Sequence, residues 1–167
     1  MDFESAIENI PALSLLPIEI ITVSLKKAID SSEMMPQVWK ELAEATDKLI
    51  SKVDGIVILH GTDTMAYTAC ALSFMLEGLR KPIIITGSQL PIGVLRTDAV
   101  ENIVSAFEFA ALSDKKGDPV IQEVAIYFEY ELLRGNRAYK RSSNEFNAFS
   151  SPNYPALASS GVRITVN

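Results

Sequence analysis

The fold is decided by the stretch D-G-I-V-I-L-H-G-T-D-T, residues Asp54–Thr64, in which a turn, an apolar run and a polar run follow one another. Asp54-Gly55 is typical of a turn. Ile56–Leu59 is short and mostly β-branched, which predicts a strand buried on both faces, as in a parallel sheet. The polar residues His60–Thr64 come next, and Met65–Leu79 is predicted to be a helix. Because ligands of open α/β sheets bind outside the carboxyl ends of strands, where a helix start also offers unpaired N–H groups, we expect a site at residues 60–64.

Further strand and helix patterns lie on both sides of this stretch. More strands are predicted at Ile18–Leu25, Ile83–Thr86, Glu123–Phe128, Leu132–Arg134 and Val162–Val166. The third and fourth of these are close enough in sequence to form a hairpin. Strands that alternate with helices at short spacing indicate βαβ units. We therefore expect an α/β fold, with a three-layer, open, mostly parallel sheet that carries helices on both faces.

The helices and loops are predicted from apolar spacing and from signals at their ends. Pro36 suits the first turn of a helix that ends at Asp54-Gly55. Asp98, followed by Glu101 three residues later, resembles a capping box at the start of another helix. Phe146–Gly161 is rich in Ser, Pro and Ala and is predicted to be a loop. The pattern contains no clear domain boundary, so residues 1–167 are expected to form one domain.

The composition is that of a globular protein and argues against several functional classes. The 167 residues are 48% hydrophobic and 22% charged, which suffices for a buried core. A net charge of −6 argues against broad nucleic-acid binding, which needs clustered Lys and Arg. Cys70 is the only cysteine, so no intrachain disulfide is expected. Since no apolar run is long enough to span a membrane and the first residues lack the features of a secretory signal, we expect a cytoplasmic protein without a membrane partner.

Thr62, Asp63 and Thr64 are the first candidates for chemistry. They place two hydroxyls and a carboxylate beside the start of a predicted helix. Thr and Asp are also good helix caps, and that structural interpretation stays open beside the catalytic one. His60 is the only histidine and has no second ligand at the spacing that a metal requires, so no metal is expected. A hydrogen-bonded structural role is favoured for His60 over the role of a base.

Three other segments carry polar groups that suit the same site. Lys140, with Arg137 and Arg141 nearby, can deprotonate a hydroxyl where its neutral form is favoured, although a solvated basic turn explains the same residues. Asp30-Ser31-Ser32 either offers hydroxyls and N–H groups to a carboxylate or forms an Asx or Ser turn. Gly87–Gln89 follows another predicted buried strand, which places its polar groups at the same edge. The sequence contains no G-x-G-x-x-G motif or P-loop, which counts against a dinucleotide or nucleoside triphosphate.

Four motifs along the chain point to a known family. They are D-S-S-E-M at Asp30–Met34, H-G-T-D-T-M-A-Y-T-A at His60–Ala69, K-P-I-I-I-T-G-S-Q at Lys81–Gln89 and R-G-N-R-x-x-K at Arg134–Lys140. In this order they resemble the motifs of the bacterial L-asparaginases, and the first of them resembles the cytoplasmic type I branch in particular. The resemblance covers essentially the whole chain.

The resemblance implies hydrolysis of L-asparagine to L-aspartate and ammonia by a threonine nucleophile, without a metal or cofactor. By motif, Thr62, Asp63 and Lys140 resemble the Thr-Asp-Lys set of the family. It implies that Asp63 binds the substrate ammonium, that Lys140 hydrogen-bonds to Thr62, and that Asp30-Ser31-Ser32 lies where the substrate carboxylate is held, with Asp30 supporting the loop. A zwitterionic amino acid needs an anion for its ammonium and uncharged donors for its carboxylate, so these charges suit the implied substrate.

The sequence also departs from the pattern of that family. Members open with a strand and a T-G-G-T-I-type loop, whose first threonine is the usual nucleophile, and no T-G-G-T occurs in this sequence. Members also carry a second α/β domain and complete each site with residues of a neighbouring subunit, which implies a homo-oligomeric dimer or tetramer. We therefore expect an amino-terminal-type domain, truncated at its start and without the carboxy-terminal domain, with little activity of its own. The alternatives left open are a non-enzymatic remnant or binding domain, and the related amidase subunit of a tRNA amidotransferase.

Overall fold

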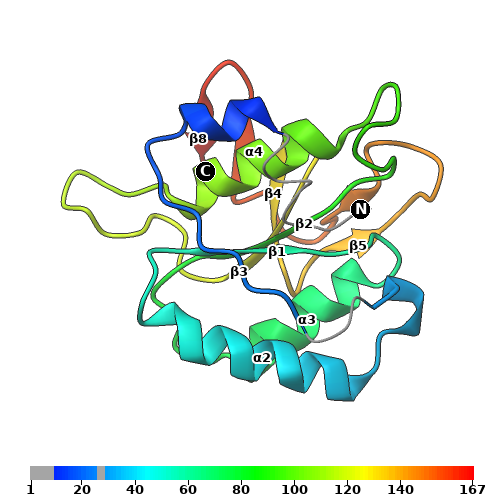
Figure 1. Ribbon diagram of the computed structural model, residues 1–167. Helices are drawn as coiled ribbons and strands as arrows, with labels where there is room; N and C mark the ends of the chain where they lie inside the picture. The colour runs from blue at the N-terminus through cyan, green and yellow to red at the C-terminus, as the bar shows by residue number, and fades with distance from the viewer. Residues whose placement is uncertain (1–9, 26–28) are drawn as a thin grey trace.

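An open six-stranded sheet lies at the centre of the computed structural model, which describes residues 10–25 and 29–167 (Figure 1). The strands follow the order β1-β2-β3-β4-β7-β8, with bounds Ile56–Leu59, Ile83–Thr86, Val124–Phe128, Glu131–Arg134, Ala158–Ser160 and Ile164–Val166. β1, β2 and β3 are parallel, whereas each of the remaining strands is antiparallel to the strand before it in this order. Four of the six strands therefore run in one direction, and the predicted β3–β4 hairpin and last strand are confirmed.

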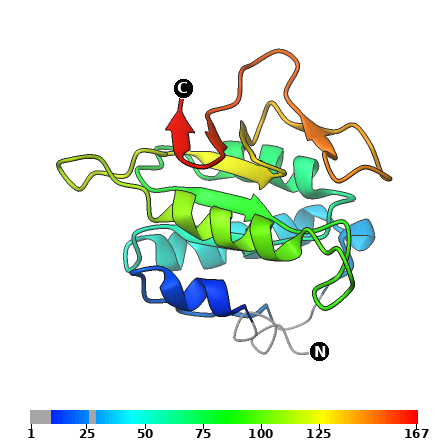
Figure 2. The same ribbon diagram turned by 90° about the horizontal axis from the view of Figure 1, so that it is seen from above.

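Helices cover both faces of the sheet, which confirms the predicted three-layer α/β fold. Figure 1 shows α2 (Pro36–Ile50) and α3 (Met65–Met75) on one face and α4 (Ala99–Ala110) on the other. The short 3-10 helix η1 (Pro11–Leu15) lies on the side of α4, as Figure 2 also shows. The smaller elements are the 3-10 helix η2 and a separate two-stranded ribbon of β5 and β6, with bounds Ser31–Glu33, Tyr139–Lys140 and Phe149–Ser150.

The core is organised around β2, whose side chains are buried on both faces of the sheet. Ile83 and Ile85 pack in the cluster beneath α3, and Ile84 packs in the cluster beneath α4. All three are fully buried. Because burial of an Ile side chain is worth about 1.5–3 kcal/mol, this continuous apolar run fixes β2 inside the sheet, between β1 and β3.

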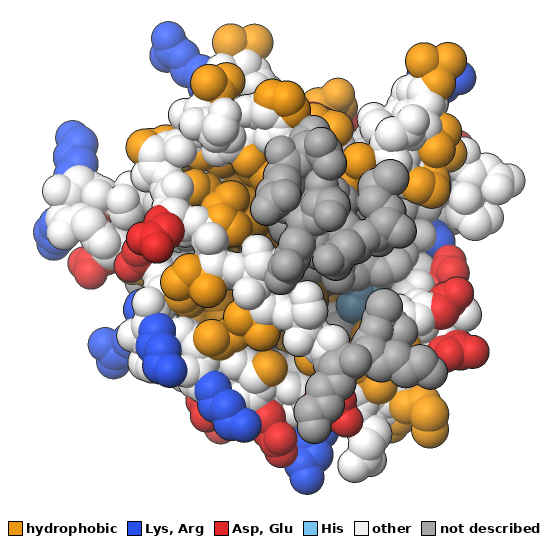
Figure 3. Space-filling model, viewed as in Figure 1, with side chains coloured by type: hydrophobic (Ala, Val, Ile, Leu, Met, Phe, Trp, Pro, Cys, Tyr) orange, Lys and Arg blue, Asp and Glu red, His pale blue; other side chains and the backbone are white. Residues whose placement is uncertain are grey.

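The predicted helices form, but two of them end earlier than the sequence suggests. α2 begins at Pro36 as predicted and ends at Ile50, not at Asp54-Gly55. α3 ends at Met75, not at Leu79, because the chain turns at Gly78, whose φ is +69°. Figure 3 shows Lys, Arg, Asp and Glu side chains along the rim where α2 lies in Figure 1, so the polar side of this helix faces solvent.

The predicted strand at Ile18–Leu25 is wrong. The segment pairs with no strand in the part of the chain that the structure describes. Ile21 and Val23 are 64% and 57% exposed, while Ile20 packs on the cluster that η1 forms with α4. β-branched residues favour an extended backbone, but a strand also needs a neighbour with free N–H and C=O groups.

The predicted loop Phe146–Gly161 is wrong in part, since it contains β6 and β7. Phe149 of β6 is buried against Phe128, with ring centroids 5.0 Å apart. Ala158 of β7 pairs with Leu132 in β4. Strands of two or three residues are too short to show an apolar alternation, so only their tertiary partners define them.

Candidate active site

The candidate site is built on residues His60–Thr64, which we call the elbow, between the end of β1 and the start of α3 (Figure 1). Two glycines allow other segments to approach it closely. A Cβ atom at Gly61 would overlap the side chain of Ser31, and one at Gly87 would overlap the carbonyl oxygen of His60. The elbow, the loop that contains Ser31 and the end of β2 are therefore held together at the carboxyl edge of the parallel strands.

Lys140 joins the two side chains of the elbow that the sequence singles out. Its Nζ atom donates hydrogen bonds to Thr62 Oγ1 and to Asp63 Oδ1, each at 2.8 Å. Lys140 lies on β5, so the ribbon of β5 and β6 carries it over the elbow from 78 residues away. The side chain of Lys140 is 16% exposed and that of Asp63 is 63% exposed, so the carboxylate remains accessible to a ligand.

The other basic residues of the segment Arg134–Arg141 are engaged elsewhere or face solvent. Arg134 forms an ion pair with Glu123, with Nε to Oε2 at 2.6 Å, and stacks on Tyr154. Arg141 binds within its own loop, where it lies 3.2 Å from Glu145. Among the described basic residues, the hydrogen bonds to the elbow side chains come from Lys140.

Gln89 adds a fourth side chain to this cluster. Thr62 Oγ1 donates a hydrogen bond to Gln89 Oε1 at 3.0 Å, and Gln89 Nε2 donates to the carbonyl of Glu145 at 2.9 Å. The sequence places the polar groups of Gly87–Gln89 at this edge without identifying Gln89 as a site residue. Its signal is its position in the short polar segment that follows the buried strand β2.

Asp98 holds the backbone of the Gln89 loop. Its carboxylate accepts hydrogen bonds from the backbone N–H groups of Gln89 and Leu90, and from Asn102 Nδ2. The predicted capping box of Asp98 and Glu101 is wrong, because the Asp98 carboxylate accepts from this loop and from the Asn102 side chain, and not from the backbone N–H groups at the start of its own helix. The Glu101 carboxylate accepts instead from the hydroxyl groups of Ser105 and Tyr127.

The loop Asp30–Ser32 lies against the elbow but is partly occupied with its own hydrogen bonds. Thr64 Oγ1 donates to the carbonyl of Ser31 at 2.6 Å, which ties the loop to the elbow. Asp30 Oδ1 accepts from the Ser32 backbone N–H and hydroxyl at 2.9 and 2.8 Å. Both hydrogen bonds lower the pKa of Asp30, and the bond from the backbone N–H of Ser32 has the larger effect. The turn and the binding interpretation of this loop are thus compatible, with Asp30 as its internal support.

His60 is hydrogen-bonded within the protein. Its Nδ1 atom lies 2.6 Å from the carbonyl of Gly61, which only accepts, so Nδ1 carries the hydrogen. Its Nε2 atom therefore accepts a hydrogen bond from Thr68 Oγ1 at 2.9 Å, and Thr68 Oγ1 in turn accepts from Trp39 Nε1. Burial lowers the pKa of His60, although its bond to Gly61 acts in the opposite direction. The neutral ring links α2, α3 and the elbow.

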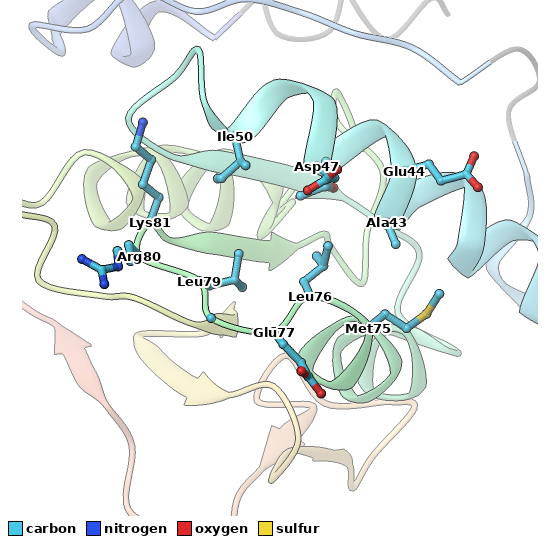
Figure 4. A pocket seen from close by; sticks show the side chains of 12 residues that line it. Ala43, Glu44, Asp47, Ile50, Met75, Leu76, Glu77, Leu79, Arg80 and Lys81 are labelled. Carbon is cyan, nitrogen blue, oxygen red and sulfur yellow. The ribbon is translucent and has the colours of Figure 1, made fainter.

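Two hollows of the described surface lie away from the elbow. Figure 4 shows one of about 570 Å³ between α2 and the α3–β2 connection, lined by residues such as Asp47, Leu76 and Lys81. It contains none of the predicted site residues.

The described residues include no group of His, Cys, Asp and Glu that suits a metal ion. None of the helices in residues 10–25 and 29–167 is both long enough and apolar enough to cross a membrane.

The fold and the site together define an α/β protein with a threonine–lysine–aspartate cluster at the carboxyl edge of its sheet. The chain belongs to the asparaginase family, because the model "Asparaginase, N-terminal" matches residues 1–167. It is 48% identical to L-asparaginase 1 of Escherichia coli K12 over 81% of this chain and 38% of that protein. It is also 40% identical to a glutamyl-tRNA(Gln) amidotransferase subunit of Thermococcus kodakarensis, over 83% of this chain and 32% of that protein.

A solved structure supports the same assignment. The crystal structure of L-asparaginase I from Vibrio cholerae matches with a TM-score of 0.87 and 41% sequence identity, over 100% of this chain and 49% of that chain. The chain therefore spans half or less of the length of these relatives. The resemblance deduced from the motifs is confirmed at the level of family and fold.

The structure brings together most of the residues that the sequence proposes for the site. Lys140 is hydrogen-bonded to both Thr62 and Asp63, and the Asp30–Ser32 loop is joined to the elbow by the hydrogen bond of Thr64. Their catalytic and substrate-binding roles stay predictions.

Proposed function

We propose that this chain carries part of the site of an amidohydrolase that converts L-asparagine to L-aspartate and ammonia. The observation that supports this most strongly is the double contact of Lys140 Nζ with Thr62 Oγ1 and Asp63 Oδ1. It joins a hydroxyl, an amine and an accessible carboxylate within one hydrogen-bonded cluster. Acyl transfer needs a nucleophile or an activated water beside a proton-transfer group, and Thr62 with Lys140 has this chemistry.

Each side chain has a role that its surroundings suit. The exposed carboxylate of Asp63 binds the α-ammonium of the substrate, and the loop Asp30–Ser32 receives the α-carboxylate through backbone N–H and hydroxyl groups. Lys140 holds the hydroxyl of Thr62 beside the carboxamide. The sequence has no T-G-G-T segment, so we expect this chain to bind the amino acid and to release ammonia slowly. Homo-oligomer formation and a cytoplasmic location also stay predictions.

The test measures binding of L-asparagine and L-aspartate together with ammonia release. Asp63→Asn removes the charge that faces the ammonium and is expected to weaken binding about tenfold or more, since charge-assisted hydrogen bonds contribute roughly 1.5–3 kcal/mol. Asp114→Asn is the matched control, because Asp114 lies in an exposed turn of its own. Equal affinities of the two variants, or no saturable binding by the folded wild-type chain, would refute the proposal.

A second function has some support from the similarity to the amidotransferase relative. We treat it as amide release from L-glutamine for a transfer reaction. Both ligands are therefore titrated in the same assay. Tighter binding of L-glutamine than of L-asparagine would favour this alternative. Binding of either amino acid without any release of ammonia would favour a non-enzymatic binding domain.

A further inference from the structure

We infer that Gln89 fixes the direction of the Thr62 hydroxyl, so that Thr62 presents a hydrogen-bond acceptor to the crevice and selects a carboxamide over a carboxylate. This inference rests on the proposed function, because it names the ligand group that the same site distinguishes. Gln89 is then a positioning residue that acts through Thr62.

The orientation of the Gln89 amide follows from its second partner. One end of the amide lies 2.9 Å from the carbonyl oxygen of Glu145, which can only accept a hydrogen bond. The amide nitrogen must therefore face Glu145, and the amide oxygen must face Thr62. The backbone of Gln89 is held as well, because its N–H lies 2.9 Å from the buried carboxylate of Asp98. The oxygen and the nitrogen of the Gln89 amide therefore cannot swap positions.

The direction of the Thr62 hydroxyl follows from the orientation of that amide. Thr62 has one hydroxyl hydrogen, and Gln89 Oε1 at 3.0 Å has none to give. The hydrogen must therefore point to Gln89, since two oxygens at this distance without a hydrogen between them repel each other. Lys140 Nζ at 2.8 Å must then donate to Thr62, as it also does to Asp63. The hydrogen bonds run in one direction, from Lys140 through Thr62 and Gln89 to Glu145.

This ordering determines what Thr62 offers to a ligand. A hydroxyl oxygen has one hydrogen and two lone pairs. The hydrogen is bound to Gln89 and one lone pair accepts from Lys140, so one lone pair remains. A carboxamide NH₂ group can donate to it. A carboxylate has no hydrogen to donate and would meet that lone pair with its own, so this arrangement disfavours the carboxylate product.

The test compares dissociation constants for L-asparagine and L-aspartate in the wild-type chain and in Gln89→Met. Methionine has a similar length but removes the acceptor, which frees the Thr62 hydroxyl to donate to a carboxylate. The ratio of the L-aspartate to the L-asparagine dissociation constant is expected to fall about tenfold, which corresponds to about 1.4 kcal/mol. Ammonia is measured in the same samples to correct for consumed L-asparagine. A ratio that stays within about twofold of wild type, or ~0.4 kcal/mol, would overturn the inference.

Thr62→Val separates this effect from a loosened loop. Valine has the shape of threonine but no hydroxyl, so Gln89→Met should leave the ratio unchanged in the Thr62→Val background. The same fall in both backgrounds would overturn the inference. A readout without ligand is the Thr62 χ1 rotamer from three-bond NMR couplings, expected to be single in wild type and averaged in Gln89→Met. A fixed rotamer without binding of either amino acid would refute the proposed function and the ligand selection, whereas averaging in wild type would refute the hydroxyl orientation itself.

Discussion

Replacement of Asp98 by alanine should destabilise the protein far more than replacement of an exposed carboxylate with the same kind of contact. Asp98 is 7% exposed and accepts from two backbone N–H groups and from Asn102 Nδ2. Its loss leaves the N–H groups of Gln89 and Leu90 without their acceptor in a partly buried loop. At about 1–3 kcal/mol for each unsatisfied group, with incomplete additivity, we expect a loss of about 3 kcal/mol.

The control for Asp98→Ala is Asp114→Ala. Asp114 also accepts from two backbone N–H groups, those of Lys116 and Asp118, but it lies in an exposed turn where water can replace it. We expect a loss of about 1 kcal/mol or less there. Urea unfolding followed by circular dichroism gives both free energies. Equal losses for the two variants would show that burial of the Asp98 contacts adds nothing, and the reasoning would fail.

Three further predictions concern the elbow and its surroundings. Gly61→Ala should displace the loop of Ser31 and weaken amino-acid binding about tenfold (~1.4 kcal/mol), while Gly161→Ala, where a Cβ has space, should leave the dissociation constant unchanged. Glu129 has φ 46° in the two-residue β3–β4 turn, so Glu129→Asn should raise the free energy of unfolding by about 0.5–1 kcal/mol, and a loss of stability would contradict this. The pKa of His60 is lowered by burial, so its contribution to stability is complete above pH 6.5 and is lost as the pH falls from there through its folded-state pKa. The difference in unfolding free energy between pH 7.5 and pH 5.5 should therefore be smaller in His60→Asn than in wild type, and an equal difference would refute this assignment.

The sequence predicts the centre of the fold because its signals there are local. Ile83–Ile85 is apolar on both faces. Asp54-Gly55 directly precedes β1, and Pro36 is the first residue of α2. Ile18–Leu25 has the same β-branched composition, but it forms no strand because pairing depends on a partner that composition does not reveal. β6 and β7 are missed for a related reason, since strands of two or three residues are defined only by contacts such as that of Phe149 with Phe128.

The residues of the candidate site can be predicted where a motif lies at the end of a strand. They cannot be predicted where the site depends on contacts between segments that are far apart in the sequence. Thr62 and Asp63 lie in the elbow that follows β1. Lys140 is found by resemblance, since nothing local in its basic segment distinguishes it from Arg137 or Arg141. Gln89 is brought to Thr62 by the packing of β2 beside β1, and Asp98 mimics a helix cap in sequence while it binds a loop in space. Such contacts between segments leave no local pattern.

The most direct test of the account is where L-asparagine binds on the chain. Backbone amide shifts of the isotope-labelled protein are followed by NMR during titration with L-asparagine, with D-asparagine as the control. We predict saturable shifts at Ser31, Thr62, Asp63 and Gln89, with weaker or no effects from the D-enantiomer. Shifts confined to the hollow beside Leu76 and Lys81, or no saturable shifts while the protein stays folded, would contradict the claim that the Thr62, Asp63 and Lys140 cluster is a site for this amino acid.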